Sequence, residues 1–263
     1  MLLSDVVFRA VIGAAVALGV VAVSRRAHAL STSGAVAAVI VGTLAVAAGW
    51  SWGALLFSMF VAASALSKAG NGQKAARLAA IVEKGSERDA YQVLANGGVF
   101  CAAALGQIIS PSPVWLAMAA GALAASSADT WATEVGTMSA VDPISIITGK
   151  RVPPGTSGGI TLVGTAASVA GALFIAVVAA LAAWPTSFTA IVVGGSVGAL
   201  ADSVLGGTLQ ERWWCDLCSK ETERLVHGCG TKTRLVGGLP GLNNDAVNAA
   251  CSGLGALVAL ALS

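Results

Sequence analysis

The sequence has very little charge. Asp, Glu, Lys and Arg make up only 11% of its 263 residues, whereas an average soluble domain has about 25%. Hydrophobic residues make up 56%, and the mean hydropathy is +0.81. Successive windows of about 20 residues, the length that crosses a bilayer as a helix, contain few or no charges. This composition excludes the common soluble enzyme folds and predicts an integral membrane protein.

Several familiar catalytic signatures are also missing. His28 and His227 are the only histidines, and neither follows a G-x-S-x-G string, which argues against a Ser-His-Asp hydrolase. No G-x-x-x-x-G-K-[ST] string is present, so a P-loop is excluded. The D-G-x-x-A-R string expected of a CDP-alcohol-type transferase is absent as well. The net charge of +2 gives no indication of a nucleic acid partner.

Eight apolar segments predict an all-α fold, a polytopic membrane bundle that forms one domain over residues 1–263. The 32 glycines suit such a bundle, because small residues let helices approach closely in lipid. The first segment is too long for a secretory signal and further segments follow it, so we read it as a helix. The segments are residues 6–24, 34–49, 52–67, 93–109, 113–128, 160–183, 187–207 and 245–262.

The connections between these segments alternate in charge. Those after segments two, four and six ("GWSW", "SPSP" and "WPTS") have no charged residue. Because cytoplasmic loops collect Lys and Arg, we expect the four long connections inside and both termini outside, with only Arg9 departing from this pattern. The long connections contain fourteen of the fifteen basic residues: Arg25, Arg26, Lys68, Lys74, Arg77, Lys84, Arg88, Lys150, Arg151, Arg212, Lys220, Arg224, Lys232 and Arg234.

Four acidic residues lie near the predicted cytoplasmic ends of the segments. Asp129 and Glu134 are in "LAASSADTWATEVG" (123–136), Asp202 lies late in segment seven, and Asp245 begins segment eight. A charge at membrane depth costs about 2.5–3.5 kcal/mol and usually marks function. Carboxylates with amide oxygens are ligands that Mg²⁺ accepts, so we predict a shared magnesium site. The alternative is that these groups only hold helices together or solvate the interface. The amides are Asn96, Asn243, Asn244 and Asn248.

The stretch "GKRVPPGTSGG" (149–159) supplies the opposite charge. Pro153 and Pro154 prevent a helix from continuing, and the Gly-rich residues after them lead into segment six. We expect backbone N–H groups at that helix start, together with Lys150, to hold an anion; the alternative is an ordinary juxtamembrane loop. A metal site beside a phosphate-binding loop is what phosphoryl transfer to a lipid requires.

The stretch "CDLCSKETERLVHGC" contains a separate cluster, Cys215, Cys218, His227 and Cys229, within the connection 211–243. Its C-x-x-C spacing fits a zinc knuckle over residues 215–229. Disulfides are disfavoured on the cytoplasmic side, which leaves structural zinc, idle thiols or a redox role. The other two cysteines, Cys101 and Cys251, lie in apolar segments and read as small core residues.

Five strings in order, "QVLANGG", "SSADTWATEVG", "GKRVPPGTSGGITLVG", "ADSVLGGTLQ" and "NNDAVN", carry a family resemblance that extends from Ser33 to Ala256. The chain resembles the integral membrane family that contains the plant and cyanobacterial phytyl-phosphate kinase. The resemblance implies transfer of a γ-phosphate from a nucleoside triphosphate, with CTP preferred, to an isoprenoid monophosphate such as phytyl or geranylgeranyl phosphate. It also implies a distant kinship with phytol and dolichol kinases.

The resemblance implies a nucleotide site on the cytoplasmic face. Asp129, Glu134, Asp202 and Asp245 would hold Mg²⁺ and act in catalysis together with Lys150. Two rival functions remain: a transporter or flippase for a phosphorylated lipid, and a kinase for the free prenyl alcohol. A transporter should have polar groups towards both faces, whereas the outer connections here contain no charged residue. The residues that match the family strings as substrate-binding positions are Asn96, Gly97, Thr130, Gly155, Thr156, Ser157, Gly158, Gly159, Gln210, Asn243, Asn244 and Asn248.

Overall fold

The structure is a computed structural model that describes residues 3–69, 87–222 and 225–263. These residues form eight helices, and each predicted apolar segment coincides with one of them, which confirms the helical membrane architecture. Four of the predicted cytoplasmic charges, Lys74, Arg77, Lys84 and Arg224, lie outside the described residues. The helices are α1 (Leu3–Arg26), α2 (Thr32–Ala48), α3 (Trp50–Ala69), α5 (Ala90–Ile109), α6 (Pro113–Gly136), α7 (Leu162–Leu181), α8 (Phe188–Thr208) and α9 (Asn244–Ala261).

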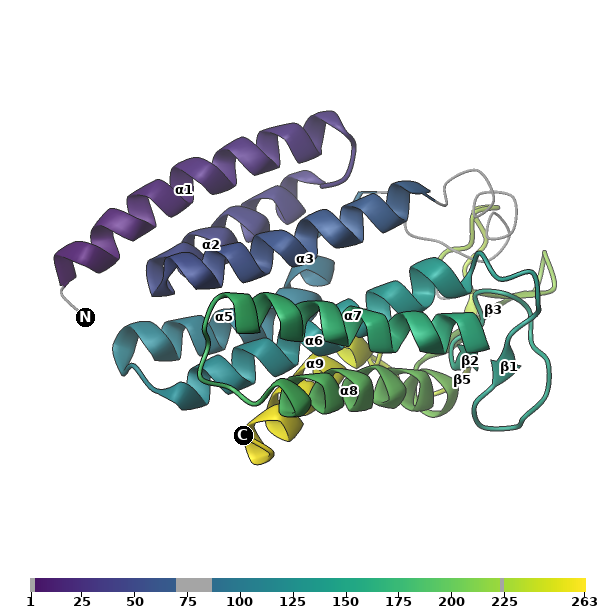
Figure 1. Cartoon of the computed structure of the whole chain (residues 1–263). Coiled ribbons are helices and arrows are strands. Elements are labelled where there is room, and N and C mark those ends of the chain that lie inside the picture. Colours follow the sequence, from purple (N-terminus) through teal and green to yellow (C-terminus); the bar gives the residue numbers. More distant parts are fainter. Residues whose placement is uncertain (1–2, 70–86, 223–224) are drawn as a thin grey trace.

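The helices run alternately up and down between the two ends of the bundle (Figure 1). Both chain termini lie at one end, and all the short strands lie at the other. The uncharged connections are therefore at the end with the termini, and the charged connections are at the end with the strands. This is the alternation that the charge pattern predicts, whereas the cytoplasmic position of the strand end remains a prediction.

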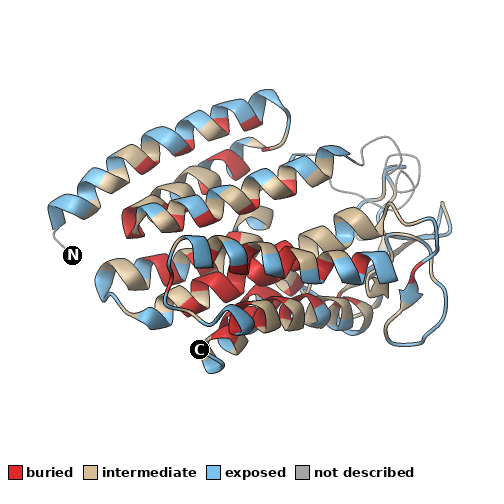
Figure 2. Cartoon of the chain, in the orientation of Figure 1, coloured by how far each residue is buried: buried red, intermediate tan, exposed pale blue. Residues whose placement is uncertain are grey.

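Helix α6 lies at the centre of the bundle and contacts α3, α5, α7, α8 and α9. Residues 119–128 of this helix are all buried, and all but Leu123 are Ala, Gly or Ser, so neighbouring helices can approach closely. Buried residues are concentrated around it, while α1 is mostly exposed (Figure 2). A helix surrounded in this way is shielded from lipid. It can therefore carry polar side chains at membrane depth.

Five helices have the length and apolar composition to cross a membrane, namely α1, α3, α5, α7 and α8. Helix α2 is as apolar but has only 17 residues. Helices α6 and α9 fall outside this set because polar stretches interrupt them. Both carry residues of the predicted site: Asp129 and Glu134 lie on α6 and Asp245 lies on α9, while Asp202 lies on α8.

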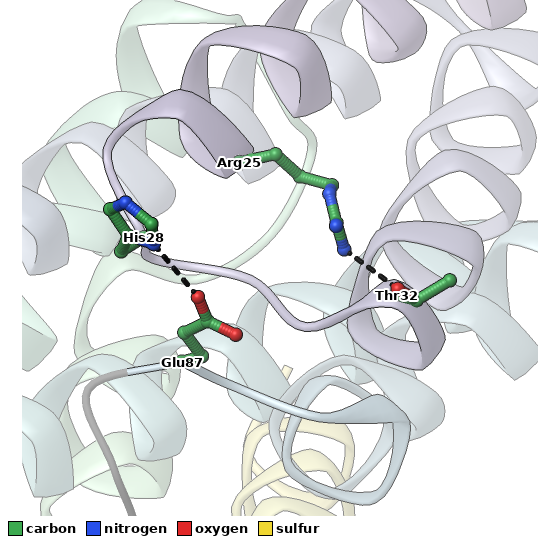
Figure 3. Close-up of polar contacts among 4 residues, drawn as sticks. All are labelled: Arg25, His28, Thr32 and Glu87. Atoms are coloured by element: carbon green, nitrogen blue, oxygen red, sulfur yellow. Dashed lines mark hydrogen bonds and ion pairs between the residues drawn. The ribbon is translucent and has the colours of Figure 1, made fainter.

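Helix α5 begins where the chain is hydrogen-bonded to the α1–α2 turn. The backbone N–H of Arg88 donates to Ala29 O at 3.0 Å, and that of Ser31 donates to Arg88 O at 3.0 Å. His28 Nδ1 lies 3.1 Å from Glu87 Oε1, and Arg25 donates to Thr32 Oγ1 at 3.0 Å on the same turn (Figure 3). These contacts fix the start of α5.

Two small β-structures lie at the strand end. Strands β1 (Ile144–Ser145) and β2 (Gly159–Ile160) pair as an antiparallel hairpin after α6. Between α8 and α9, strands β3 (Arg212–Cys215), β4 (Lys220–Thr222) and β5 (Arg234–Gly237) form an antiparallel sheet in the order β4-β3-β5. The sequence predicted only polar connections here, because strands of two to four residues are too short to produce a recognisable alternation.

Candidate functional site

Four helices each contribute a polar residue to one pocket, which lies towards the strand end of the bundle. Asp129 comes from α6, Asp202 from α8, Asn96 from α5 and Asn248 from α9. The pocket is too narrow to admit a water molecule. Two of the four predicted acids and two of the predicted amides are therefore in one place. The remaining lining residues are Ala125, Ser126, Cys251 and Ser252. We call this the carboxyl-pair pocket.

The carboxyl groups of Asp129 and Asp202 are close enough to hydrogen-bond to each other and to repel when both are charged. A hydrogen bond between two carboxyl groups requires one proton between them, and a cation can take the place of that proton. The Cys251 thiol also hydrogen-bonds with Asp202. Carboxylate and amide oxygens are the donors that a hard divalent cation prefers, so the donor set of this pocket fits magnesium.

Hydrogen bonds between helices hold this pocket together. The hydroxyl of Ser126 on α6 donates to the backbone oxygen of Asn96 on α5 at 2.9 Å. Ser252 on α9 donates to the backbone oxygen of Ala122 on α6 at 3.4 Å. The Asn96 side chain donates to Gln92 O at 3.0 Å within its own helix, which fixes its rotamer. The polar groups therefore sit on helices that are fixed relative to one another.

A second pocket, of about 380 Å³, lies between the first turns of α5 and α9. Asp245 and Asn243 line it, together with the apolar side chains of Leu94 and Ala246. It is next to the carboxyl-pair pocket along both helices. On α5, Ala95 lines this pocket and Asn96 lines the carboxyl-pair pocket. On α9, Ala249 lines this pocket and Asn248 lines the carboxyl-pair pocket. We call it the α5–α9 pocket. Its other lining residues are Tyr91 and Gly241.

Glu134 does not line either pocket. The sequence placed Asp129 at the end of its helix, but α6 continues to Gly136. Five residues along an α-helix correspond to a rotation of about 140° and a rise of about 7.5 Å. Half-buried Glu134 is therefore on another face of α6. The four acids expected at one magnesium site are thus divided among the carboxyl-pair pocket, the α5–α9 pocket and the end of α6.

Two other predicted substrate-binding residues face elsewhere. The Thr130 hydroxyl donates to Ser126 O at 2.8 Å within α6. Gly97 is buried on the side of α5 that faces Val41 of α2, where an added Cβ would lie 3.6 Å from a methyl carbon. Neither residue is among those that line the two pockets. Their role in substrate binding stays a prediction.

The Gly-rich stretch forms tight turns and does not lead directly into a helix. The N–H of Thr156 donates to Pro153 O at 3.2 Å, and the N–H of Gly159 donates to Thr156 O at 2.9 Å. Strand β2 follows, and the Thr161 side chain caps α7 by accepting from Gly164 N at 3.0 Å. The expected open helix start is therefore replaced by a capped one.

The Gly-rich stretch nevertheless lies against the end of α8 that carries Asp202. An added Cβ at Gly158 would be 2.6 Å from Gly207 Cα and 2.9 Å from Ser203 O. An added Cβ at Gly206 would be 3.6 Å from Ser157 Cβ, and Gly155 and Gly158 both have positive φ. The turn thus contacts Ser203, the residue that follows Asp202 in α8. Lys150 is exposed at the start of this stretch, and its carbonyl accepts from Ser145 N at 2.8 Å.

The remaining predicted residues lie at the junction of α8 and α9. Gln210 is buried just beyond α8, and the Asn243 side chain caps α9 by accepting from Ala246 N at 3.0 Å. Asn244 is half-buried one turn before Asn248 on the same face of α9. The N–H of Glu211 donates to Leu242 O at 2.9 Å across the base of the connection. These bonds hold the ends of the two helices together.

The cysteine cluster is assembled as the spacing predicts. The candidate ligand atoms of Cys215, Cys218, His227 and Cys229 all lie within 4.8 Å of one another. Hydrogen bonds with Thr231 and His227 lower the pKa of the Cys229 thiol to about 5. Hydrogen bonding with Cys229, followed by desolvation, raises the pKa of the Cys218 thiol to about 11.

Besides apolar Ala125, sequence reasoning missed three residues of the carboxyl-pair pocket, Ser126, Cys251 and Ser252. Cys251 had been interpreted only as a core residue. The spacing from Asn248 could have predicted Cys251 and Ser252 as pocket residues, because residues three and four positions after Asn248 lie on the same helix face. Polar or polarizable residues at that spacing in an otherwise apolar helix indicate a shared pocket.

Comparison with known proteins finds several relatives of this chain. Protein PGR of Arabidopsis thaliana is 30% identical over 254 residues, which cover 86% of each chain. An uncharacterized membrane protein of Synechocystis is 32% identical over 193 residues, 70% of this chain and 71% of its own. One from Methanocaldococcus jannaschii is 30% identical over 193 residues, 72% and 78% of the two chains. No solved structure matches. Because residues 15–256 match the family described as "Integral membrane protein DUF92", the chain belongs to that family.

Proposed function

We propose that the protein is a prenyl-phosphate kinase, which transfers the γ-phosphoryl group of a nucleoside triphosphate, CTP by preference, to an isoprenoid monophosphate. An oxygen of the lipid phosphate attacks the γ-phosphorus, and the bond from that phosphorus to the nucleoside diphosphate breaks. The products are the prenyl diphosphate and the nucleoside diphosphate. The observation that carries the proposal is the convergence of Asp129, Asp202, Asn96 and Asn248 from four helices in one pocket beside a docked Gly-rich turn.

The carboxyl-pair pocket is the proposed magnesium site. Asp129 and Asp202 would hold the ion, with amide oxygens from Asn96 and Asn248 available beside them. A bound magnesium ion would offset negative charge on the phosphoryl group during transfer. Because the pocket is too narrow even for water in this conformation, we expect the two carboxyl groups to separate when the ion replaces their shared proton.

The α5–α9 pocket is the proposed place of the acceptor phosphate. It adjoins the carboxyl pair, and it combines the polar groups of Asn243 and Asp245 with apolar Leu94, which is 47% exposed on the bundle surface. An apolar tail could extend from there along α5 and α9. Since a phosphate monoester oxygen is nucleophilic at neutral pH, the reaction requires no dedicated general base.

The turn from Gly155 to Gly159 is the proposed holder of the nucleotide phosphates. It contacts α8 at Gly207 and at Ser203, the residue after Asp202. Lys150 lies exposed at the beginning of the same loop, so its flexible side chain is free to approach an anion. Positioning and charge stabilisation are most of what phosphoryl transfer requires from a protein.

The direct test is a transfer assay with purified protein. The protein is incubated with Mg²⁺, each γ-labelled nucleoside triphosphate, and phytyl, geranylgeranyl or farnesyl monophosphate. We expect label in the prenyl diphosphate, fastest with CTP, and no label without divalent metal. Failure of every nucleotide to label any lipid monophosphate would refute the kinase proposal.

Two parallel arms address the rival functions. The free prenyl alcohols replace the monophosphates in the first, where labelled monophosphate would indicate an alcohol kinase. In the second, the protein is reconstituted in vesicles with a fluorescent prenyl phosphate, and movement of the lipid between leaflets without nucleotide would indicate a flippase. The proposal expects neither result.

A further inference from the structure

We propose that Cys215, Cys218, His227 and Cys229 bind one zinc ion, which holds together the connection between α8 and α9. This site lies in the soluble connection and is independent of the proposed kinase reaction. All four side chains belong to a single stretch of the chain. One comes from strand β3, one from the turn after it, and two from the next turn.

The distances between the ligand atoms fit a tetrahedral metal site. With Zn–S bonds of about 2.3 Å and Zn–N bonds of about 2.0–2.1 Å, neighbouring ligand atoms in a tetrahedron are about 3.5–3.8 Å apart. Cys215 Sγ lies 3.6 Å from Cys229 Sγ, and His227 Nδ1 lies 3.2 Å from Cys229 Sγ. A disulfide would require about 2.05 Å between the sulfur atoms. The cluster has the size of a zinc site and is too open for a disulfide.

Two backbone turns present the ligands to each other. Cys218 lies in the turn that joins β3 to β4, and this turn closes at Ser219 with a φ of 51°. The opposing turn is closed by His227 N donating to Thr231 O at 2.9 Å and by Gly230 N donating to His227 O at 2.8 Å. Cys215 at the end of β3 and Cys218 in the first turn thus lie on one side of the cluster, and His227 and Cys229 in the second turn lie on the other, as in a zinc knuckle.

The connection has little else to hold it in shape. Cys215 and Thr222 are the buried residues among the described positions from 211 to 242, and Leu217 and Leu225 are 72% and 64% exposed. A segment of this size without an apolar core usually requires a metal or disulfides for stability. A structural zinc site would provide this stability directly.

The surroundings of the cluster also suit a metal with three thiolates. Thr231 Oγ1 lies 3.4 Å from Cys229 Sγ, where its hydroxyl can donate to a metal-bound thiolate. Asp216, between the first two cysteines, pairs with Arg234 of β5 at 3.1 Å. Three thiolates and one imidazole around Zn²⁺ carry a net charge of −1, and nearby Lys220 and Lys232 partly offset it.

The coordination set makes the site structural. Four protein ligands fill a tetrahedron, whereas a catalytic zinc keeps one position open for water or substrate. The proposed zinc would fix the outer end of the β3–β5 pair. The inner end is fixed by Leu239 N donating to Leu209 O at 2.9 Å, at the C-terminus of α8. The metal would therefore stabilise the connection between the helices that carry Asp202 and Asn248.

The test uses the full-length protein purified in detergent without chelators. Elemental analysis should find about one zinc per chain, and exchange with Co²⁺ should give the visible absorption of tetrahedral thiolate-bound cobalt. The double variant Cys215→Ser/Cys218→Ser should lose both signals and become more sensitive to proteolysis between α8 and α9. Cys101→Ser is the matched control on α5 and should keep them.

A further variant tests the proposal even if the serine variants fail to fold. His227→Cys retains four ligands and should keep about one zinc per chain, while cobalt absorption should shift to that of four thiolates. Wild-type protein with no zinc that also fails to bind Co²⁺ would overturn the proposal. So would a Cys215–Cys229 disulfide found by mass spectrometry in protein prepared under reducing conditions.

Discussion

At the residue scale, the acidic side chains differ in their surroundings. Asp129 and Asp202 share one enclosed pocket and interact directly, whereas Asp245 lines the more open neighbouring pocket. Two carboxyl groups in contact are unfavourable without a proton or a cation between them. A protein that only needed hydrogen bonds between helices could use an amide at one of these positions, which requires neither a proton nor a cation.

The variant Asp202→Asn removes the charge and keeps the size of the side chain. If the carboxyl pair holds magnesium, kcat should fall by about 10²–10³, as when one electrostatic stabiliser is removed from an active site. The membrane yield and melting temperature should stay near wild type, since an Asn–Asp hydrogen bond replaces the carboxyl pair. Asp142→Asn, an exposed acid at the same end of the bundle, is the control. Near-normal turnover of Asp202→Asn would exclude the assignment.

The variant Asp245→Asn tests whether Asp245 belongs to the acceptor pocket or is a magnesium ligand together with Asp129 and Asp202. Because Asp245 lines the α5–α9 pocket, replacing its carboxylate with an amide should mainly affect binding of the anionic acceptor. With one negative charge fewer beside the phosphate, we expect a lower or unchanged KM for the lipid phosphate and a loss in kcat of less than about tenfold. Steady-state kinetics with the lipid varied at saturating nucleotide would measure both. A loss in kcat as large as that of Asp202→Asn would return Asp245 to the metal site.

At the element scale, the carboxyl-pair pocket depends on a close crossing of α6, α8 and α9. A Cβ at Gly255 would lie 2.6 Å from Ala125 Cβ and 2.8 Å from Gly121 O, distances that force the helices apart. Gly255→Ala should therefore destabilise the bundle by about 1–3 kcal/mol. Gly253→Ala on the same helix has open space within 4 Å and should be neutral or stabilising. Thermal unfolding in detergent compares the two, and equal melting temperatures would contradict the crossing.

The Gly-rich turn depends on another close contact. Gly158 has a φ of 77°, and its added Cβ would meet Gly207 Cα at 2.6 Å. Gly149 has a φ of 67° in the same loop but has open space around it. Both Gly→Ala variants should incur a backbone penalty of about 1–2 kcal/mol, and only Gly158→Ala should also displace the turn from α8. Higher protease sensitivity of this loop in Gly158→Ala than in Gly149→Ala would confirm the docking.

Elements with strong local signals were predictable from the sequence. Long apolar runs between turn residues identified the eight helices, and C-x-x-C spacing identified the cysteine cluster, because both signals are local. The division of the acids was not predictable. It depends on α6 continuing past Asp129 to Gly136, so that Glu134 lies on another face. The cap at Thr161 was not predictable either. It depends on Gly158 packing against α8 and on Gly159 pairing in strand β2.

At the scale of the whole molecule, the polar groups are placed by the shielding that the bundle provides. Helix α6 is surrounded by five other helices, and α1 lies at the edge with mostly exposed apolar residues. Lipid can cover α1, while α6 and α9 keep their carboxyl and amide groups away from it. A charged residue would be costly in the middle of α1, whose charged residues lie towards its two ends, and it is tolerable on the shielded α6, which agrees with the position of Asp129.

The orientation of the bundle follows from the distribution of basic residues. The charged connections lie at the strand end, and the uncharged connections lie at the end with the termini. The strand end should therefore face the cytoplasm. Intact cells treated with a membrane-impermeant maleimide test this. Ser110→Cys, in the exposed connection after α5, should be labelled, whereas Asp142→Cys should be labelled only after permeabilisation. Wild type, whose exposed Cys229 lies at the strand end, gives the background labelling before and after permeabilisation and serves as the control. Labelling of Asp142→Cys but not Ser110→Cys would invert the orientation, and the proposed kinase site would then face away from the cytoplasmic nucleotides that it requires.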